Sequence, residues 1–422
     1  MQPRNVIVRP LGAPSAAVAS AALLVVSLGA LAALCVVQHV PMADTSVYRA
    51  EGAAVASGGD LYGFTVTEWE LPATYPPFAA ILFVPTTWLP TAALKGVFLA
   101  GNVALLALLV RLSCRLAHLP ARAPLLCAAT ALGLWLEPVF QTVLFGQINL
   151  ALACLVLWDL TRPRGALGKG FWLGVAAGIK LTPAVFVAYL LLRGRTREAG
   201  TAVAAFAGTV LLGALVLPSA SVEFWTRRLY ETGRVGKAWI VDNQSLQGLV
   251  ARALHLAEPG LAWAGAAALA GAAGLWAARR ARREAHGLLA AALTALLVSP
   301  ISWSHHWVWC VPLLALLAAD GRVRLAAAVA ALFTARTFWL LPHQGDLDLR
   351  LPWWQQPLAA PYALLALGLL PYLCLSGVRS RAGDEAVPPP RTGGVPGAGG
   401  GVPRGAGSRQ PPASSSSAST IR

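Results

Sequence analysis

Charged side chains are scarce in this 422-residue sequence: they make up 12% of it, whereas hydrophobic residues make up 57%. A soluble domain carries roughly 25% charged residues, so about half of the charge that would normally face water is missing. The mean hydropathy is accordingly high, at +0.62. This composition excludes a large soluble enzyme, a secreted disulfide scaffold and a disordered protein, and it predicts an all-α polytopic membrane protein.

Several signatures of enzyme chemistry are also missing. The six cysteines include no pair with CxxC or finger-like spacing, which argues against a disulfide framework and a zinc site. The chain has no glycine-rich phosphate loop followed by Lys-Ser/Thr, no GxSxG elbow and no HExxH motif. We therefore expect no metal, no cofactor and no cytosolic nucleotide chemistry.

Basic residues outnumber acidic ones by 33 to 18, which gives a net charge of +15. The arginines stand in short clusters between apolar runs, a pattern typical of the cytoplasmic charge bias that orients membrane helices. We therefore expect membrane lipid around the chain and no nucleic-acid partner. Residues 1–13 are predicted to be cytoplasmic, and the Pro/Gly/Ser-rich residues 377–422 are predicted to form a disordered cytoplasmic tail.

Apolar runs approaching the roughly 20 residues of a spanning helix recur along the chain. They cover 14–38, 94–112, 124–144, 148–160, 201–218, 261–278, 287–303, 306–319, 324–341 and 358–376. The arginine clusters share the cytoplasmic side only if 76–90 stays outside without crossing and 171–192 forms a hairpin with Lys180 and Pro183 near its tip. This solution predicts ten to twelve membrane segments within 14–376, both termini in the cytoplasm, and outer loops at 39–75, 219–243 and 342–357. The basic residues of the second outer loop (Arg227, Arg228, Arg234 and Lys237) either weaken this orientation or form an outer anion site.

Together with the tight turns near Gly146 and Ser302, the outer loops carry most of the acids, histidines and amides taken as one group, so chemistry is expected on the outer face. Asp44 follows the first span by six residues. Its carboxylate could act as general base on a hydroxyl acceptor, or it could cap a short surface helix.

Two further groups point to an anionic ligand. Lys180 lies in the middle of an apolar segment, where a lysine marks a functional site by default unless it snorkels to the cytoplasmic side, and a phosphate is its natural partner. His305 and His306 stand beside Trp303 at an outer turn, where a histidine can hydrogen-bond a phosphate or assist proton transfer. A shared metal ion is the weaker interpretation, because adjacent residues diverge on a helix.

Tyrosines and amides complete the candidates. Tyr75 belongs to an aromatic turn at the predicted membrane interface. Gln147 and Asn149 could contact a sugar or satisfy the backbone at a bend, and Asn243 and Gln244 could bind polar ligand groups, with helix capping by Asn243 as the alternative.

Taken together and in this order, seven runs resemble glycosyltransferase family 87. They are Asp44 to Gly63, Thr74 to Ala80, Gly146 to Asn149, Gly178 to Ala184, Gly233 to Gly236, Asn243 to Ser245 and Ser299 to Trp309. The resemblance covers about residues 15–376 and implies a GT-C type membrane fold with an outward-facing, periplasmic cavity in the plasma membrane. It also implies polyprenyl phosphomannose as donor and a lipid-anchored mannoside, such as a phosphatidylinositol mannoside or lipomannan, as acceptor. Asp44 matches the family's first-loop base, His305 and His306 match its histidine pair, and Lys180 matches its lysine.

The residues and the resemblance together predict an inverting mannosyltransferase. Asp44 would take the proton from the acceptor 2-hydroxyl, while Lys180, Arg234 and one of the two histidines would offset charge on the leaving phosphate. The remaining candidates are expected to bind substrate: Tyr48, Tyr62, Tyr75, Gln147, Asn149, Asn243, Gln244 and Trp303. A transporter or lipid flippase is the alternative, against which the lack of a convincing internal repeat counts modestly. No oligomeric state is predicted.

Overall fold

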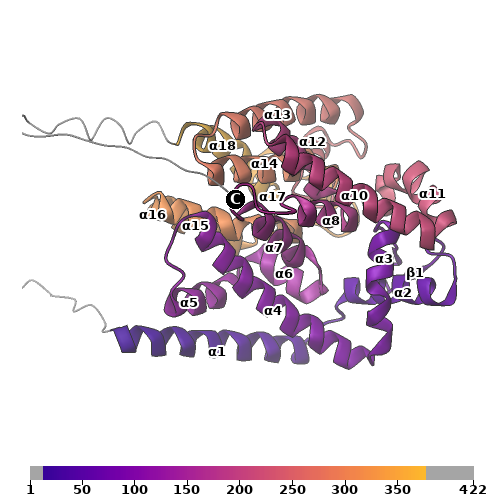
Figure 1. Cartoon of the computed structure of the whole chain (residues 1–422), viewed down its shortest axis with the longest axis horizontal. Helices are drawn as coiled ribbons and strands as arrows, with labels where there is room; N and C mark the ends of the chain where they lie inside the picture. The colour runs from indigo at the N-terminus through magenta and orange to yellow at the C-terminus, as the bar shows by residue number, and fades with distance from the viewer. Residues whose placement is uncertain (1–12, 377–422) are drawn as a thin grey trace, which may run out of the picture. The chain divides into compact units, whose positions relative to one another are not determined.

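The computed structural model describes residues 13–376, and almost all of its regular structure is helical (Figure 1). Within these residues the sheet consists of two short antiparallel strands, β1 (Thr65–Val66) and β2 (Leu71–Pro72). The prediction of an all-α membrane protein is confirmed. The predictions for residues 1–12 and 377–422 fall outside the described residues.

Five helices of the described chain are long and apolar enough to cross a membrane. They are α1 (Ala13–Val37), α4 (Thr91–Leu116), α10 (Thr196–Val216), α13 (Gly260–Arg280), and α16 (Val323–Ala335) continued by η6 (Thr337–Leu340). Helices α10 and α13, with 21 residues each, are about 30 Å long, which matches the hydrocarbon core of a bilayer. These spans confirm a multi-pass membrane protein.

Two predicted single spans are broken. In place of 124–144 there are α5 (Ala123–Gly133) and α6 (Glu137–Phe145), bent by 74°. Most of 358–376 is α18 (Pro361–Leu375), but a bend of 76° near its start separates α18 from the segment Trp353–Ala359, which ends in α17 (Gln356–Ala359). A proline stands in the first turn of α6 and of α18, where its ring prevents the preceding helix from continuing. Counting each bent pair as one span, seven spans are possible on length and composition within residues 13–376.

The remaining apolar helices are shorter than a full span, so the ten to twelve predicted segments include partial ones. They are α3 (Pro77–Phe83) with η1 (Val84–Trp88), α7 (Asn149–Leu160), η2 (Thr182–Ala184) with α9 (Val185–Leu192), α14 (Glu284–Val298), and η5 (Ser304–Trp309) with α15 (Cys310–Ala319). Helix α14 is buried along most of its length and packs against α9, α13 and α18. Helix α14 therefore lies in the interior of the bundle.

Residues 171–192 form the predicted hairpin. Helix α8 (Phe171–Ile179) packs on α10 through three glycines spaced four apart: a Cβ on Gly170, Gly174 or Gly178 would collide with Glu198, Ala202 or Thr209, respectively. The matching order of these contacts shows that α8 and α10 run in the same direction, with close approach permitted by small residues. Helix α9, which joins them, must therefore run back, and Lys180 and Pro183 lie at the turn.

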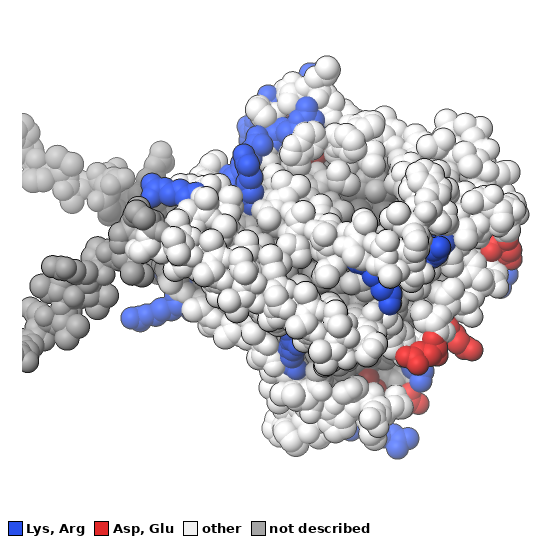
Figure 2. All heavy atoms as spheres, turned by 90° about the horizontal axis from the view of Figure 1, so that it is seen from below, with Lys and Arg blue, Asp and Glu red and all other residues white. Residues whose placement is uncertain are grey.

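The loops gather the polar elements at one end of the bundle, which we call the outer end after the predicted topology. Helix α2 (Ala43–Ser57), α3, β1 and α11 (Pro218–Thr226) lie together there (Figure 1). Figure 2 shows a surface with few charges on which most of the visible acidic side chains lie toward this end. The chain continues through η3 (Arg228–Tyr230), η4 (Thr232–Arg234) and α12 (Leu246–Leu254), and later through η7 (Leu347–Arg350) and η8 (Trp353–Gln355).

Candidate active site

Asp44 lies in the first turn of α2, a helix outside the membrane spans. The N-cap of α2 is Met42, which has a left-handed backbone (φ 48°), and no side chain caps the helix. The alternative that Asp44 caps this helix is therefore wrong. Its side chain is half-buried and receives a hydrogen bond from the side chain of Gln147.

The environment of Asp44 makes its carboxylate more basic than usual. Burial raises its pKa to about 6, and the negative charge of Asp242 adds to this, whereas the Gln147 hydrogen bond and the positive charge of Lys180 oppose it. A carboxylate with a pKa near 6 remains mostly ionised at neutral pH and accepts a proton more readily than an exposed one. These are the properties of a general base.

Two buried tyrosines hold Gln147 in place. The hydroxyls of Tyr48 and Tyr75 donate to Gln147 Oε1 at 2.9 and 3.2 Å and lie 3.1 Å from each other. Gly146 ends α6 with a positive φ of 68°, which turns the chain so that Gln147 faces α2. The Gln147 oxygen is fully used by the tyrosines, so its amide nitrogen is left to donate to Asp44. The Tyr62 hydroxyl donates a hydrogen bond to the Tyr75 carbonyl at 2.9 Å and so helps to hold Tyr75 in place.

Lys180 joins three segments of the site. The lysine ends α8 in an extended conformation, and its Nζ lies 3.1 Å from Asn149 Oδ1, 3.1 Å from His306 Nε2 and 5.5 Å from the centre of the Tyr75 ring. Asn149 Nδ2 donates in turn to the His305 carbonyl at 3.0 Å. Because the ammonium is engaged here, the snorkelling alternative does not hold in this structure.

The two histidines offer unpaired nitrogens. Lysine only donates, so His306 accepts through Nε2 and carries its proton on Nδ1. Neither His306 Nδ1 nor either ring nitrogen of the buried His305 has a hydrogen-bond partner among residues 13–376. Buried polar atoms without partners are costly, so these nitrogens mark where polar groups of a ligand would bind. No group of three or more metal-ligating side chains occurs in the described chain.

A narrow cavity of about 40 Å³ leads away from Lys180, Asn149 and His306. Beyond this polar mouth its walls are mostly apolar and come from α7, η2, α9, α14 and η5; they include Leu152, Val156, Phe186, Leu296 and Trp309. A cationic mouth above apolar walls fits a phosphate ester that carries a hydrocarbon chain. We call this feature the apolar slot.

Two predicted substrate-binding amides are used by the backbone instead. Asn243 is fully buried, and its side chain bonds the carbonyls of Ala238 and Pro300 at 2.8 and 3.0 Å and the amide of Ser302 at 2.9 Å. Gln244 is likewise buried: its amide nitrogen donates to the carbonyls of Val241 and Ala359, and its oxygen accepts from the Tyr362 amide. The structure places both amides in the scaffold, and the N-cap of α12 is Ser245, so Asn243 does not cap it.

Trp303 pairs through its backbone with Asn243, and its half-buried ring packs on Gly236. A Cβ at Gly236 would come within 2.8 Å of that ring. The outer loop that contains Gly236 is therefore docked directly on the histidine turn.

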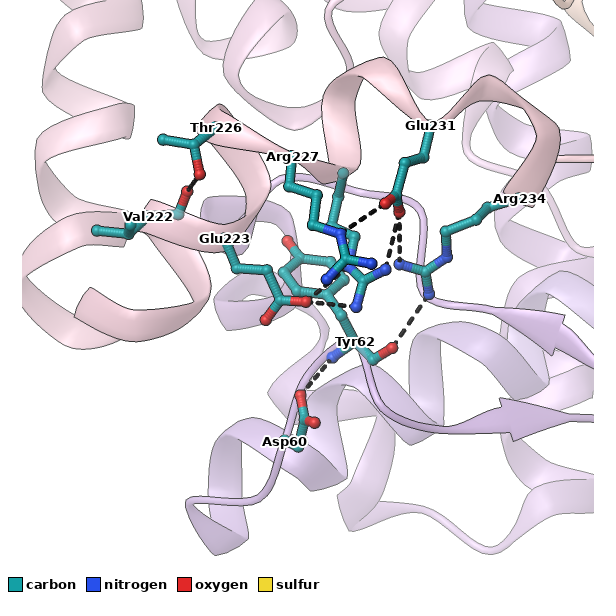
Figure 3. A network of polar contacts seen from close by, with 9 residues as sticks. Asp60, Tyr62, Val222, Glu223, Thr226, Arg227, Glu231 and Arg234 are labelled. Carbon is teal, nitrogen blue, oxygen red and sulfur yellow. Dashed lines mark hydrogen bonds and ion pairs between the residues drawn. The ribbon is translucent and has the colours of Figure 1, made fainter.

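Arg234 lies apart from Lys180. It donates to the Tyr62 carbonyl at 3.1 Å and lies 4.0 Å from Glu231, in the loop network of Figure 3. These contacts help to hold Tyr62 in position. Among the described residues, Arg234 contacts neither Lys180 nor the two histidines.

The other basic residues of this outer loop are balanced by neighbouring acids. Arg227 pairs with Glu231 at 2.6 Å (Figure 3). Arg228 pairs with both Glu223 and Glu231. Lys237 pairs with Asp346 at 2.9 Å. These local ion pairs argue against the alternative that the basic residues form an open anion site, and the predicted orientation stays a prediction.

Sequence reasoning missed two acids near the base. Asp242 accepts from the Ser304 amide at 3.1 Å, and burial raises its pKa to about 6. Glu51 is fully buried on α2, accepts from the Thr74 amide at 3.3 Å, and has a pKa raised by burial to about 8. In the sequence, Asp242 could have been found from its position directly before Asn243, which was predicted to bind substrate.

Comparison with known proteins identifies the family. The sequence model of glycosyltransferase family 87 matches residues 73–300. A Mycobacterium tuberculosis protein named polyprenol-phosphate-mannose-dependent alpha-(1-2)-phosphatidylinositol mannoside mannosyltransferase is 36% identical over 359 residues, which cover 78% of this chain and 83% of the relative. A protein of the same name from Mycolicibacterium smegmatis is 37% identical over 383 residues, which cover 81% and 86%. No solved structure matches significantly. The match and the relatives show that the chain belongs to glycosyltransferase family 87.

Proposed function

We propose that the chain moves mannose from polyprenyl phosphomannose to the 2-hydroxyl of a lipid-linked mannoside, of phosphatidylinositol mannoside or lipomannan type, at the outer face of the plasma membrane. One observation carries the proposal: the basic carboxylate of Asp44 interacts electrostatically with the half-buried ammonium of Lys180, and that ammonium stands at the mouth of the apolar slot. The names of the two mycobacterial relatives supply the donor and the acceptor.

On the acceptor side, Asp44 takes the proton from the 2-hydroxyl while that oxygen attacks the anomeric carbon of the donor. The new carbon–oxygen bond forms as the bond to the phosphate oxygen breaks, and polyprenyl phosphate leaves with the electron pair. Asp44 then returns its proton to water. A single displacement inverts a β-linked donor and gives an α-linked product.

On the donor side, negative charge builds on the leaving phosphate. The Lys180 ammonium and the His306 Nδ1–H are the donors positioned to meet it, and they are held before the donor binds by Asn149 and the α8 terminus. Preorganised donors in a site that excludes water stabilise such charge strongly. The first units of the polyprenyl chain would follow the apolar slot, which must widen between α7, α9 and α14 to admit them.

A polytopic transporter or lipid flippase is the alternative function. It also requires membrane helices and a buried cation, but it leaves the substrate chemically unchanged. The arrangement of a base, a cationic site and an apolar slot favours transfer, as do the names of the relatives.

One experiment separates the two functions. Purified full-length protein is incubated with polyprenyl phosphomannose and a mannoside lipid, and both lipids are followed by mass spectrometry. Transfer predicts an acceptor heavier by one hexose and an equal amount of polyprenyl phosphate. Unchanged masses, with substrate moved across a vesicle membrane, would favour the transporter.

A further inference from the structure

A second cavity, of about 470 Å³, lies at the other end of the bundle. We call it the arginine cavity, and it is lined by Arg164, Arg193, Arg195, Glu198, Arg279 and Glu284. It forms where α9 turns into α10 and where α13 turns into α14. Helices α10 and α13 are both candidate spans, so their ends at Thr196 and Arg280 place the cavity at a membrane surface. Helix α10 ends at Val216 next to α11, so this surface is opposite the outer end (Figure 1).

The cavity keeps an excess of positive charge. Four arginines face two glutamates, which leaves two net positive charges. Both glutamates are engaged by one arginine, Arg195, which pairs with Glu284 at 2.5 Å and with Glu198. The side chains of Arg164 and Arg279 form no ion pair with any residue in 13–376.

Two of the arginines are held rigidly. Arg193 donates to the carbonyls of Arg279 and Ala281 at 2.9 and 2.8 Å, which fixes it across the end of α13. The side chain of Arg195 is only 11% exposed, and its buried Nε has no hydrogen-bond acceptor among the described residues. A donor left unpaired in a cationic cavity points to an acceptor supplied by a ligand.

The cavity is bordered by exposed apolar and aromatic side chains of the kind that contact lipid. Leu192 lines the cavity, and both it and Leu191 are exposed on the same turn of α9. Trp276, also exposed, lies one turn before Arg280, whose guanidinium stacks 5.5 Å from the centre of its ring. Tryptophan at the end of a spanning helix is typical of the membrane interface.

We propose that the arginine cavity binds the phosphate head group of an anionic phospholipid, with the acyl chains lying against Leu191 and Leu192. Guanidinium groups bind phosphate oxygens in pairs, and basic pockets between spanning helices are recognised sites for anionic head groups. A free phosphate shares this chemistry, but it would leave the two leucines uncovered.

Native mass spectrometry of the detergent-solubilised full-length protein tests this assignment. Three probes are titrated: dihexanoyl phosphatidylglycerol, dihexanoyl phosphatidylcholine and inorganic phosphate. We expect one phosphatidylglycerol to bind at least about tenfold more tightly than phosphatidylcholine. The double substitution Arg164→Gln with Arg279→Gln should reduce that affinity by about tenfold or more, since each arginine near a surface contributes a few-fold or more.

A matched control removes the same charge elsewhere. Arg322→Gln with Arg324→Gln changes two exposed arginines at the start of α16, outside the cavity, and should alter the affinity less than about twofold. Equal binding of the two lipids, or equal losses in the two double variants, would overturn the proposal. Inorganic phosphate that binds as tightly as phosphatidylglycerol and displaces it would also overturn the assignment to a lipid. The single variant Arg279→Gln, expected to lose part of the affinity, serves if the double variant fails to fold.

Discussion

The pH dependence of transfer should report the protonation of Asp44. The perturbation is a change of pH between 5 and 7.5, applied to the wild-type protein with both substrates well below saturation. Under these conditions kcat/KM follows the pKa of the base in the free enzyme. The pKa of Asp44 is raised to about 6, chiefly by burial.

The expected magnitude follows from this value. With a pKa near 6, about nine-tenths of the Asp44 carboxylates are ionised at pH 7 and about one-tenth at pH 5. The value of kcat/KM should therefore fall by roughly tenfold between pH 7 and pH 5. An aspartate with its ordinary pKa near 3.8 would remain ionised throughout this range, and kcat/KM would hardly change.

The assay measures the initial rate of hexose gain by the acceptor at each pH, with folding checked by size-exclusion chromatography after incubation. Glu68→Gln provides the control, because Glu68 is an exposed carboxylate in the same outer loop, and its pH profile should match that of the wild type. A profile that stays flat from pH 7 to pH 5 would refute the assignment of Asp44 as a base with a raised pKa.

Three further predictions concern the neighbours of Asp44. Asp242→Asn should move the acid limb of kcat/KM to lower pH, because the charge of Asp242 helps to raise the pKa of Asp44; an unchanged limb would show that the two carboxylates do not interact. Lys180→Gln should reduce kcat/KM by roughly 10²–10³-fold, since it removes a charged donor from the leaving phosphate, and a loss below tenfold would contradict that role. Glu51→Gln should stabilise the protein at pH 8 more than at pH 5. The pKa of Glu51 in the folded protein, about 8, lies above its ordinary value of 4.5, so the wild-type protein has its full stability below about pH 4.5 and loses stability as the pH rises toward 8. Glutamine carries no charge at either pH and avoids this loss. Thermal unfolding of both proteins at the two pH values measures this, and an equal difference at both would contradict it.

Much of the membrane architecture follows from the sequence, because uninterrupted apolar runs and basic clusters report directly on the bilayer. The run at 14–38 corresponds to α1, and the hairpin at 171–192 follows from the need to keep its flanking arginines on one side. Hydropathy does not report bends, however. The breaks within 124–144 and 358–376 depend on Pro138 and Pro361, which a hydropathy window averages away.

The candidate site was less accessible to prediction, because residue type alone does not tell which partner a polar group meets. The amides of Gln147 and Asn243 look alike in the sequence, yet the first faces Asp44 and the second is used by the backbone near Pro300. Their difference depends on contacts between distant segments. For the same reason Asp242 and Glu51 could not be linked to Asp44 before the fold was known.

The most direct test of the account is the transfer rate of Asp44→Asn under single-turnover conditions, with saturating polyprenyl phosphomannose and a mannoside acceptor. The amide keeps the size of the side chain but cannot take the proton of the acceptor hydroxyl. We predict that the variant inserts and binds the donor as the wild type does, while transfer slows by about 10²–10⁴-fold. A folded, donor-binding variant that transfers mannose at a near-normal rate would contradict the central role of Asp44.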